Sequence, residues 1–327
     1  MKIITRVNAC LVMLIAGAAV VPSVVAASDY PNKIVKIVVP YSATGGGPDF
    51  VGRTVAEKLS SLTGQPFIID NKPGAAATVG TAFVAKTAPD GYTILTGDTG
   101  PLSVAPGLRK NLSYDTLRDF MPVSNGVRAP IFIVVGGNKG INSLQDLAAL
   151  AKSKPGLAYG TPGIGSVHHL AMEKWLSMAG VKMTHIPYNS QSQSIPAVVS
   201  GDVTALVIAY PNIRSFISAG RVKALAVGDK ARVPFAPDVP TVAESGYPGY
   251  DVGIDVGFLV PKGTAPKVVT RLNELLHATL KSPEVAEKLS VAGLLPIPST
   301  PEQFASSIKR DYEVFKSIID ANGITSD

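Results

Sequence analysis

Three short polar segments of this chain carry residue types that bind small anions, and the first is YSATGGGPDF at residues 41–50. Its three consecutive glycines, residues 45–47, stand between an apolar run and a helical pattern. Glycine lets the backbone approach a ligand closely, and the free amides and dipole at the start of a helix attract an anion. The segment predicts an anion-binding loop, and a tight turn without a ligand is the alternative.

The donors of this first segment favour a carboxylate over a phosphate. The hydroxyl groups of Tyr41, Ser42 and Thr44 accompany the backbone amides, and the segment itself contains no cation. No Gly-Lys-Ser/Thr sequence follows, as in a Walker A loop, and Phe50 stands where a dinucleotide-binding fingerprint has its third glycine. Asp49 could cap the helix that follows the loop.

The second segment, GTPGIGSVHHL at residues 160–170, resembles the first in composition. Thr161, Gly163, Gly165 and Ser166 precede a helical pattern, so their hydroxyls and amides could bind an anion in the same way. Two such loops could hold one small anion from two sides, or one carboxylate each. Two unrelated turns are the alternative.

The histidines do not predict a metal site. His168 and His169 would point about 100° apart on a helix, which makes them a poor chelating pair. One of them could contact a ligand or cap a loop, whereas His185 lies in an apolar run and is expected in the core. We therefore predict no metal and no cofactor.

The third polar segment, TGDTGPLSV at residues 96–104, bears on whether the chain is an enzyme. Asp98 could act as a base, although a turn-forming role is favoured. The sequence contains no Gly-x-Ser-x-Gly elbow, no His-Glu-x-x-His motif and no EF-hand loop. Trp175, Tyr188 and Tyr210 could line a pocket or belong to the core. A binding protein is predicted, and catalytic residues are not.

These segments need an α/β scaffold to position them, and strands and helices do alternate along the chain. Near-continuous apolar runs predict buried strands at KIVKIVVPY, PFIIDN, YTILTG, IFIVVG, MTHIPY, TALVIA, KALAVG and DVGFLVP. Gly64 and Gly180 are expected to end helices, and Ser143 is expected to begin one. At this length two domains are expected, with chain crossings near residues 124–130 and 239–253. A ligand would then lie between two lobes.

The first 27 residues have the layout of a secretory signal peptide, because Lys2 and Arg6 precede an apolar run that ends in small residues. Their removal takes the formal net charge from +6 to +4 and removes Cys10, so the mature chain would contain no cysteine. The remaining cations are scattered and do not form the basic stripe of a nucleic-acid-binding protein. We predict an exported protein, periplasmic in a Gram-negative cell; a retained membrane anchor is the alternative.

The chain resembles the Bug-type periplasmic solute-binding proteins of tripartite tricarboxylate transporters over nearly all of its mature length. The resemblance rests on YPNKIVKIVVPYSATGGGPDFVGRTVAEKL, IDNKPGAAATVGTAFVAKTAPDGYTILTG, LSYDTLRDFMPV, GSVHHLAMEKWLSMAGVKMTHIPY, AGRVKALAV and PDVPTVAESGYPGY. It implies a type II-like Venus flytrap of two α/β lobes, each a mainly parallel sheet flanked by helices. Lobe 1 would comprise residues 28–126 and 253–327, and lobe 2 would comprise residues 127–252.

The resemblance also implies a function without catalysis or a cofactor. A small carboxylate would bind between the lobes and pass to the membrane permease of the transporter, and the protein would act as a monomer without nucleic acid. The implied ligand contacts are Tyr41, Ser42, Ala43, Thr44, Gly46, Asp49, Phe50, Thr96, Gly97, Asp98 and Thr99 in lobe 1, and Thr161, Gly165, Ser166, Val167, His168, Asn189, Ser190, Ile208 and Tyr210 in lobe 2.

Departures from the family pattern bear on the ligand. Many members have Phe-Asp-Asn where this chain has residues 207–209, Val-Ile-Ala, so the aspartate that could pair with a ligand ammonium group is Ile208 here. This change argues against an amino acid and favours a plain or aromatic dicarboxylate. A sensor that presents the acid to a membrane histidine kinase is one alternative. An enzyme acting on an organic acid, with Asp98 and His168 as its polar groups, is another.

Overall fold

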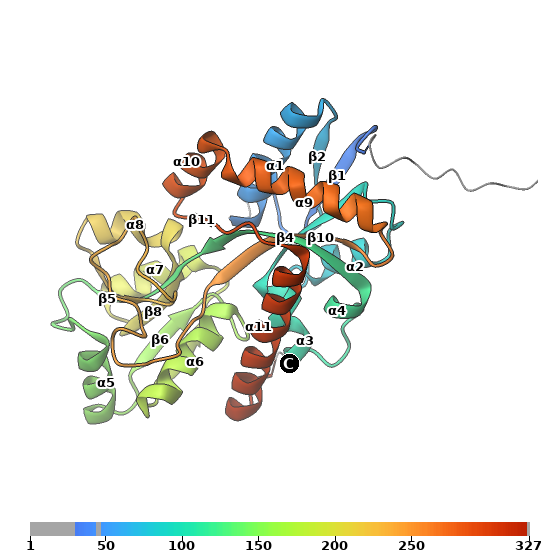
Figure 1. Ribbon diagram of the computed structural model, residues 1–327. Helices are drawn as coiled ribbons and strands as arrows, with labels where there is room; N and C mark the ends of the chain where they lie inside the picture. The colour runs from blue at the N-terminus through green and yellow to red at the C-terminus, as the bar shows by residue number, and fades with distance from the viewer. Residues whose placement is uncertain (1–29, 44–46, 326–327) are drawn as a thin grey trace, which may run out of the picture.

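The chain folds into two lobes, each built on one β-sheet with helices on both faces (Figure 1). The computed structural model describes residues 30–43 and 47–325. The predicted signal peptide, residues 1–27, lies outside this range, as do Thr44, Gly45 and Gly46 of the first polar segment. No helix within the described range is long and apolar enough to span a membrane.

Lobe 1 contains a six-stranded sheet in the order β11-β4-β10-β3-β1-β2. Its strands are β1 (Val35–Val39), β2 (Phe67–Asn71), β3 (Thr93–Asp98), β4 (Phe120–Ala129), β10 (Ile254–Pro261) and β11 (Leu295–Pro296). The first four of these run in one direction, and β10 and β11 run against them.

Lobe 2 contains a five-stranded sheet in the order β7-β6-β8-β5-β9. Its strands are β5 (Ile131–Gly136), β6 (Ala158–Thr161), β7 (Thr184–Pro187), β8 (Ala205–Ala209) and β9 (Val222–Val227). Only β5 runs against the others. Most strands of each sheet therefore run in one direction, as predicted, but the reversed strands, β10 and β11 in lobe 1 and β5 in lobe 2, make five of the nine strand pairings antiparallel.

The two sheets repeat one arrangement, which explains the likeness of the two glycine-rich segments. In lobe 1, α1 (Gly47–Thr63) joins β1 to β2 and α2 (Thr78–Ala85) joins β2 to β3. In lobe 2, α6 (Val167–Ala179) and α7 (Gln191–Ser200) join β6, β7 and β8 in the same way. In both lobes the first strand lies between the second and the third. The two segments thus follow equivalent strands, β1 and β6.

Apolar side chains fill the layers between sheets and helices. One face of the lobe 1 sheet is covered by α1, α9 (Pro266–Lys281) and α10 (Pro283–Val291), and the other by α2 and α11 (Pro301–Asn322). In lobe 2, α5 (Leu144–Ser153) and α6 cover one face, and α7 and α8 (Tyr210–Ser218) cover the other. Trp175 of α6 is fully buried in this core, so it lines no pocket.

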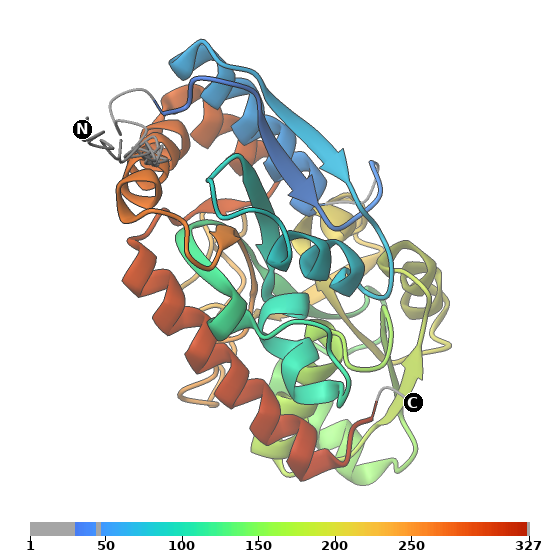
Figure 2. The same ribbon diagram turned by 90° about the vertical axis from the view of Figure 1, so that its right-hand side faces the viewer.

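Helix α11 belongs to both lobes. Phe304 and Ile308, near its start, pack in the lobe 1 core, whereas Phe315, Ile318 and Ile319 pack in the lobe 2 core. Figure 2 shows this helix running along the side of the molecule from one lobe to the other. Three short helices, η2 (Gly100–Val104), α3 (Ala105–Leu108) and α4 (Thr116–Asp119), connect β3 to β4.

The chain crosses between the lobes twice, at one place. Strand β4 passes through Pro130 directly into β5, and the segment after β9 returns into β10. A Cβ atom on Gly228 would lie 2.3 Å from the carbonyl oxygen of Val252, so only glycine lets the start and the end of this returning segment pack this closely. The backbone amide of Gly228 also donates to the carbonyl oxygen of Ile131 at 2.8 Å. The predicted lobe limits within these crossings stay a prediction.

Most local predictions are confirmed. All eight predicted strands form, Gly64 follows the end of α1, and Gly180 caps α6 with a φ of 62°. Ser143 caps α5 by accepting a hydrogen bond from the amide of Asp146. Strands β4, β6 and β11 were not predicted. Residues 124–129, expected as a break between domains, continue β4 because the reversed strand β10 pairs along it.

Candidate functional site

The predicted ligand loops lie at equivalent places in the two sheets. In each lobe, the chain runs from the first parallel strand to a neighbour on one side and then to a neighbour on the other side. The strand order therefore reverses at the carboxyl ends of β1 and β3 in lobe 1, and of β6 and β8 in lobe 2. Ligands of open α/β sheets bind at such points, because the helices diverge there and leave backbone amides free.

The first loop is anchored to β2 through a buried carboxylate. Asp49 is 5% exposed, and its side chain accepts hydrogen bonds from Arg53 Nε at 2.9 Å and Asn71 Nδ2 at 2.8 Å. Asn71 Nδ2 also donates to the carbonyl oxygen of Tyr41 at 2.9 Å. The predicted capping position of Asp49 is wrong, because α1 already begins at Gly47 and Asp49 lies within its first turn. Its carboxylate thus forms an ion pair with Arg53 and holds the loop in place.

A second buried carboxylate ties β1 to β3. Asp98 is 6% exposed, and it accepts hydrogen bonds from the hydroxyl of Tyr41 at 2.7 Å and from the amide of Gly100 at 3.0 Å. Burial raises the pKa of Asp98 to about 6, although both hydrogen bonds act in the opposite direction. The turn-forming role predicted for Asp98 is confirmed by the bond from Gly100, which starts η2.

In the second loop, Ser166 caps α6. Its hydroxyl accepts from the amide of His169 at 3.2 Å and donates to the carbonyl oxygen of Gly163 at 2.8 Å. The ring of His169 closes the loop as well, because its Nδ1 accepts from the amide of Gly165 at 3.1 Å. Gly163 and Gly165 have φ angles of 132° and 69°, which other residues rarely adopt. The loop-capping role considered for the histidines therefore belongs to His169.

Three stacked aromatic rings, those of His169, His185 and Tyr159, pack beside this loop. The rings of His169 and His185 lie 3.9 Å apart between centroids, and His185 also stacks on Tyr159 at 5.0 Å. His185 Nε2 lies 2.6 Å from the hydroxyl oxygen of Thr161, at the end of β6. Burial lowers the pKa of His169 to about 3 and that of His185 to about 4, so both are neutral at pH 7. The stack holds the loop without adding charge.

His168 presents an unsatisfied nitrogen at the start of α6. The residue is 5% exposed, and its Nε2 has no hydrogen-bond partner among the described residues. Burial lowers the pKa of His168 to about 4, and Gln191 acts on it in the opposite direction. A buried polar atom without a partner is destabilising, so this nitrogen would gain a hydrogen bond from any donor or acceptor that reaches it. No group of histidines and carboxylates in the described part of the chain is arranged to hold a metal ion.

The chain matches known receptors over most of its length. The sequence model described as tripartite tricarboxylate transporter family receptor matches residues 51–324. Protein BugT of Bordetella pertussis is 32% identical over 321 residues, which cover 98% of both chains.

The chain belongs to this receptor family.

Two solved structures share its fold and show bound acids in related proteins. The R. palustris protein Rpa4515, solved with adipate, is 30% identical with a TM-score of 0.79, covering 91% of this chain and 99% of that one. MatC (Rpa3494) from Rhodopseudomonas palustris, solved with malate, is 28% identical with a TM-score of 0.75, covering 89% of this chain and 100% of that one. The chain is thus a periplasmic solute-binding receptor, and the prediction of a binding protein instead of an enzyme is confirmed.

The other predicted contact residues of this receptor occupy varied places. Ser190 caps α7, and Gly97 packs on Leu102. Thr96 is fully buried, and its hydroxyl has no hydrogen-bond partner within residues 30–43 and 47–325. Phe50 packs partly on the lobe 1 core, and Val167 packs in the lobe 2 core. Asn189 lies in the turn before α7, and Thr99 accepts from the amide of Asp255 at 2.9 Å.

Two of the predicted contact residues, Ile208 and Tyr210, pack against apolar side chains. Ile208 is fully buried in the apolar cluster beneath α7 and α8. The ring of Tyr210 packs between Phe132 and Phe235, and its hydroxyl donates to the carbonyl oxygen of Phe235 at 3.2 Å. A Cβ atom on Gly293 would meet this ring at 2.6 Å, so Tyr210 also lies against lobe 1. Their contact with a ligand stays a prediction.

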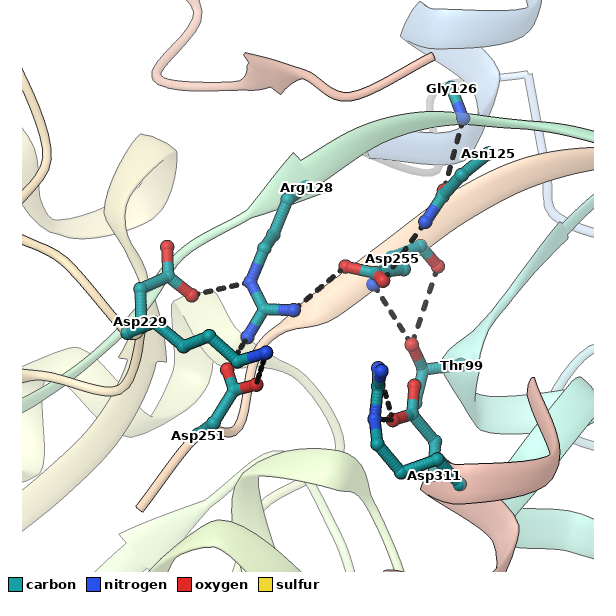
Figure 3. A network of polar contacts seen from close by, with 10 residues as sticks. Thr99, Asn125, Gly126, Arg128, Asp229, Asp251, Asp255 and Asp311 are labelled. Atoms are coloured by element: carbon teal, nitrogen blue, oxygen red, sulfur yellow. Dashed lines mark hydrogen bonds and ion pairs between the residues drawn. The ribbon is translucent and has the colours of Figure 1, made fainter. Parts of the chain in front are cut away.

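The crossing of the receptor carries an ionic network that the sequence did not reveal (Figure 3). Arg128 of β4 bonds through Nε to Asp229 at 2.5 Å, through Nη2 to Asp251 at 2.5 Å, and through Nη1 to Asp255 at 3.2 Å. The four side chains are largely buried, and burial raises the pKa of Asp229. Arg128 is the only cation between Phe120 and Ala129, and a lone arginine flanked by Val127 and Ala129 is a signal that could have indicated a buried ion pair.

Proposed function

We propose that this receptor binds a small dicarboxylate between its lobes and delivers it to the permease of a tripartite tricarboxylate transporter. The observation that supports this most is the pair of equivalent loops after β1 and β6, each built from uncharged donors at a helix start. Such donors suit carboxylates. Adipate and malate, the acids in the two related structures, are both dicarboxylates.

Each loop would bind one carboxylate. In lobe 1 the donors are Ser42 and the amides at the start of α1, while the hydroxyl of Tyr41 already donates to Asp98 and positions the loop. In lobe 2 they are the amides that follow Ser166, whose hydroxyl already donates to Gly163 and shapes the loop. The buried carboxylates stand behind the first loop and are already bonded, so they shape it without needing to contact the ligand.

His168 and Ile208 would set the preference among acids. The neutral ring of His168 offers a hydrogen bond to a ligand oxygen without a full charge. The apolar Ile208 offers no partner for an ammonium group. We therefore favour a plain or aromatic dicarboxylate over an amino acid such as glutamate.

Binding would proceed by closure of the lobes. A ligand that contacts both loops gains its full set of bonds only when the lobes are close, so it shifts the population toward the closed state. No covalent step is needed. We also propose that residues 1–27 are removed on export and that the mature monomer meets its permease in the periplasm.

Thermal unfolding of the mature protein tests this function. The panel contains succinate, adipate, malate, terephthalate, glutamate and phosphate, because a ligand that binds only the native state raises the Tm. We expect a rise with at least one dicarboxylate and none with phosphate. A rise only with phosphate, or a larger rise with glutamate than with any dicarboxylate, would contradict the proposal.

Substitution Ser166→Trp locates the site. A bulky side chain at the cap of α6 should fill the second loop and abolish the rise in Tm caused by the best dicarboxylate. Ser143→Trp, at the cap of α5 in the same lobe, is the matched control because both serines cap helices by the same bond. Unchanged affinity in Ser166→Trp would show that the second loop is not the site.

A further inference from the structure

A cavity of about 230 Å³ lies beside the lobe crossing, away from the two predicted ligand loops. Its walls come from α6 of lobe 2, from the returning segment before β10, and from α11. None of the residues predicted to contact the dicarboxylate lines it. Figure 3 shows part of its wall, with Arg128 and Asp251 on one side and Asp311 of α11 opposite.

Four cations and two carboxylates line this cavity: Arg128, Lys174, Lys230, Arg310, Asp251 and Asp311. Most of them are already paired. Arg128 is bonded to three aspartates, Arg310 bonds to Asp311 at 3.1 Å, and Lys230 lies 3.4 Å from Asp251.

Lys174 is the exception among these cations. It forms no ion pair with a described residue, although Asp251 and Asp311 are the acidic groups that act on it from across the cavity. Its ammonium group lies 5.2 Å from the centre of the ring of Tyr250, and burial lowers its pKa. A half-buried ammonium without a carboxylate partner is unfavourable, so it is a ready partner for an incoming anion.

The remaining wall is apolar. Val252, Val314 and Phe315 line the cavity together with Gly249 and Gly253. A bare inorganic anion would leave this surface without contacts, whereas a short carbon chain would cover it and lose water contact. A charged group at Lys174 and a carbon chain on the apolar wall together describe a short organic acid.

We propose that this cavity is a second binding site, for a short aliphatic carboxylate, in which Lys174 binds the carboxylate group and Val314 and Phe315 contact the chain. Lys230 and Arg310 stand at its rim and can share their donors with the bound oxygen atoms. Asp251 and Asp311 would repel a second carboxylate group in this small cavity. The site is therefore expected to take a monocarboxylate.

A ligand in this cavity would be coupled to the proposed dicarboxylate site between the lobes. The cavity has walls from lobe 2, from the crossing and from α11, which packs in both cores, so its shape depends on how the lobes are oriented. An acid in the cavity favours one orientation and thereby changes the affinity for the dicarboxylate, and the dicarboxylate changes the affinity for the acid by the same factor.

Butyrate and phosphate, at matched ionic strength, test the site through Tm and calorimetric titration. The proteins are the mature receptor, its Ser166→Trp variant, Lys174→Met, and Lys182→Met, which removes an exposed lysine near the end of the same helix. We expect butyrate to bind the receptor, Ser166→Trp and Lys182→Met alike. We expect Lys174→Met to weaken butyrate binding by roughly tenfold or more, and phosphate to have little effect.

Lys174→Arg guards against a folding defect, because it keeps the charge and should keep the binding. Equal butyrate binding by Lys174→Met and Lys182→Met would overturn the proposal, as would a response to phosphate alone. The rise in Tm that the best dicarboxylate causes in Lys174→Met is measured separately. A failure of the cavity site is therefore distinguishable from a failure of the proposed function.

Discussion

At the scale of single residues, buried polar groups define the first ligand loop. Asp49 and Asp98 hold the ends of β1, β2 and β3 together through Asn71 and Tyr41, and neither carboxylate is exposed. A loop that is proposed to bind an anion is thus supported by two carboxyl groups, each placed behind it and each hydrogen-bonded. This arrangement makes the stability of lobe 1 depend on pH.

Asp98→Asn isolates that dependence. The pKa of Asp98 is raised from 3.8 to about 6, so ionisation is less favourable in the native state, and the stability it contributes at low pH is lost as the pH rises through 6. Because asparagine cannot ionise, the free energy of unfolding of the wild type relative to Asp98→Asn should fall by about 2 kcal/mol between pH 4 and 7.

Urea denaturation at several pH values measures this difference. Asp311 and Asp229 also have raised pKa values, but they contribute equally to both proteins and cancel. Asp202→Asn, at an exposed position, serves as the control. A difference that stays constant from pH 4 to 7 would contradict the assignment.

At the scale of elements, the second loop is shaped both by glycine and by contact with the other lobe. Gly165 has a φ of 69°, and a Cβ atom there would lie 2.2 Å from Leu108 of α3 in lobe 1. The loop between β6 and α6 is therefore a place where the lobes touch. Its backbone conformation favours glycine, and any side chain there would have to displace Leu108.

Gly165→Ala should lower stability and reduce the ligand-induced rise in Tm. The left-handed conformation alone costs about 1 kcal/mol for alanine, and the methyl group must also displace Leu108. Gly180→Ala is the matched control, because Gly180 has a φ of 62° with no atom within 4 Å of the added Cβ. The double variant Gly165→Ala/Leu108→Ala should bind the dicarboxylate more tightly than Gly165→Ala, because the clash with Leu108 is removed. Equal affinities would show that the contact between residues 165 and 108 does not affect binding.

At the scale of the whole molecule, Arg128 joins the two crossings. Its guanidinium bonds to Asp229 after β9, Asp251 in the returning segment and Asp255 on β10, and it lies 2.6 Å from where a Cβ on Gly253 would be. This single side chain fixes the relative course of the strands that connect the lobes. The three carboxylates in turn require it, because they are buried.

Arg128→Met should destabilise the protein by about 3–5 kcal/mol, because it leaves buried carboxylates without a cation. The loss is measured by urea denaturation, and small-angle X-ray scattering reports whether the lobes change orientation. Arg128→Lys keeps one charge but cannot reach all three partners, so an intermediate loss is expected. A loss below about 1 kcal/mol, the value of an exposed ion pair, would show that the network does not hold the crossing.

The sequence by itself determined the local elements and the family. Apolar runs marked eight of the strands, Gly64 and Gly180 marked helix ends, and the two glycine-rich loops were found because residues adjacent in the chain shape them. Strand β4 was not predicted, because its mixed sequence forms a strand only through pairing with β10, which is more than 100 residues away in the chain.

Only the tertiary structure decided which polar groups meet. Tyr41 reaches Asp98 because β3 lies beside β1, and Arg128 meets three aspartates because the returning chain enters the sheet between β3 and β4. The same topology leaves His168 Nε2 without a hydrogen-bond partner in the described part of the chain, and it places Lys174 at the wall of a cavity. Burial and pairing are properties of distant segments brought together by the core, so residue spacing along one chain cannot encode them directly.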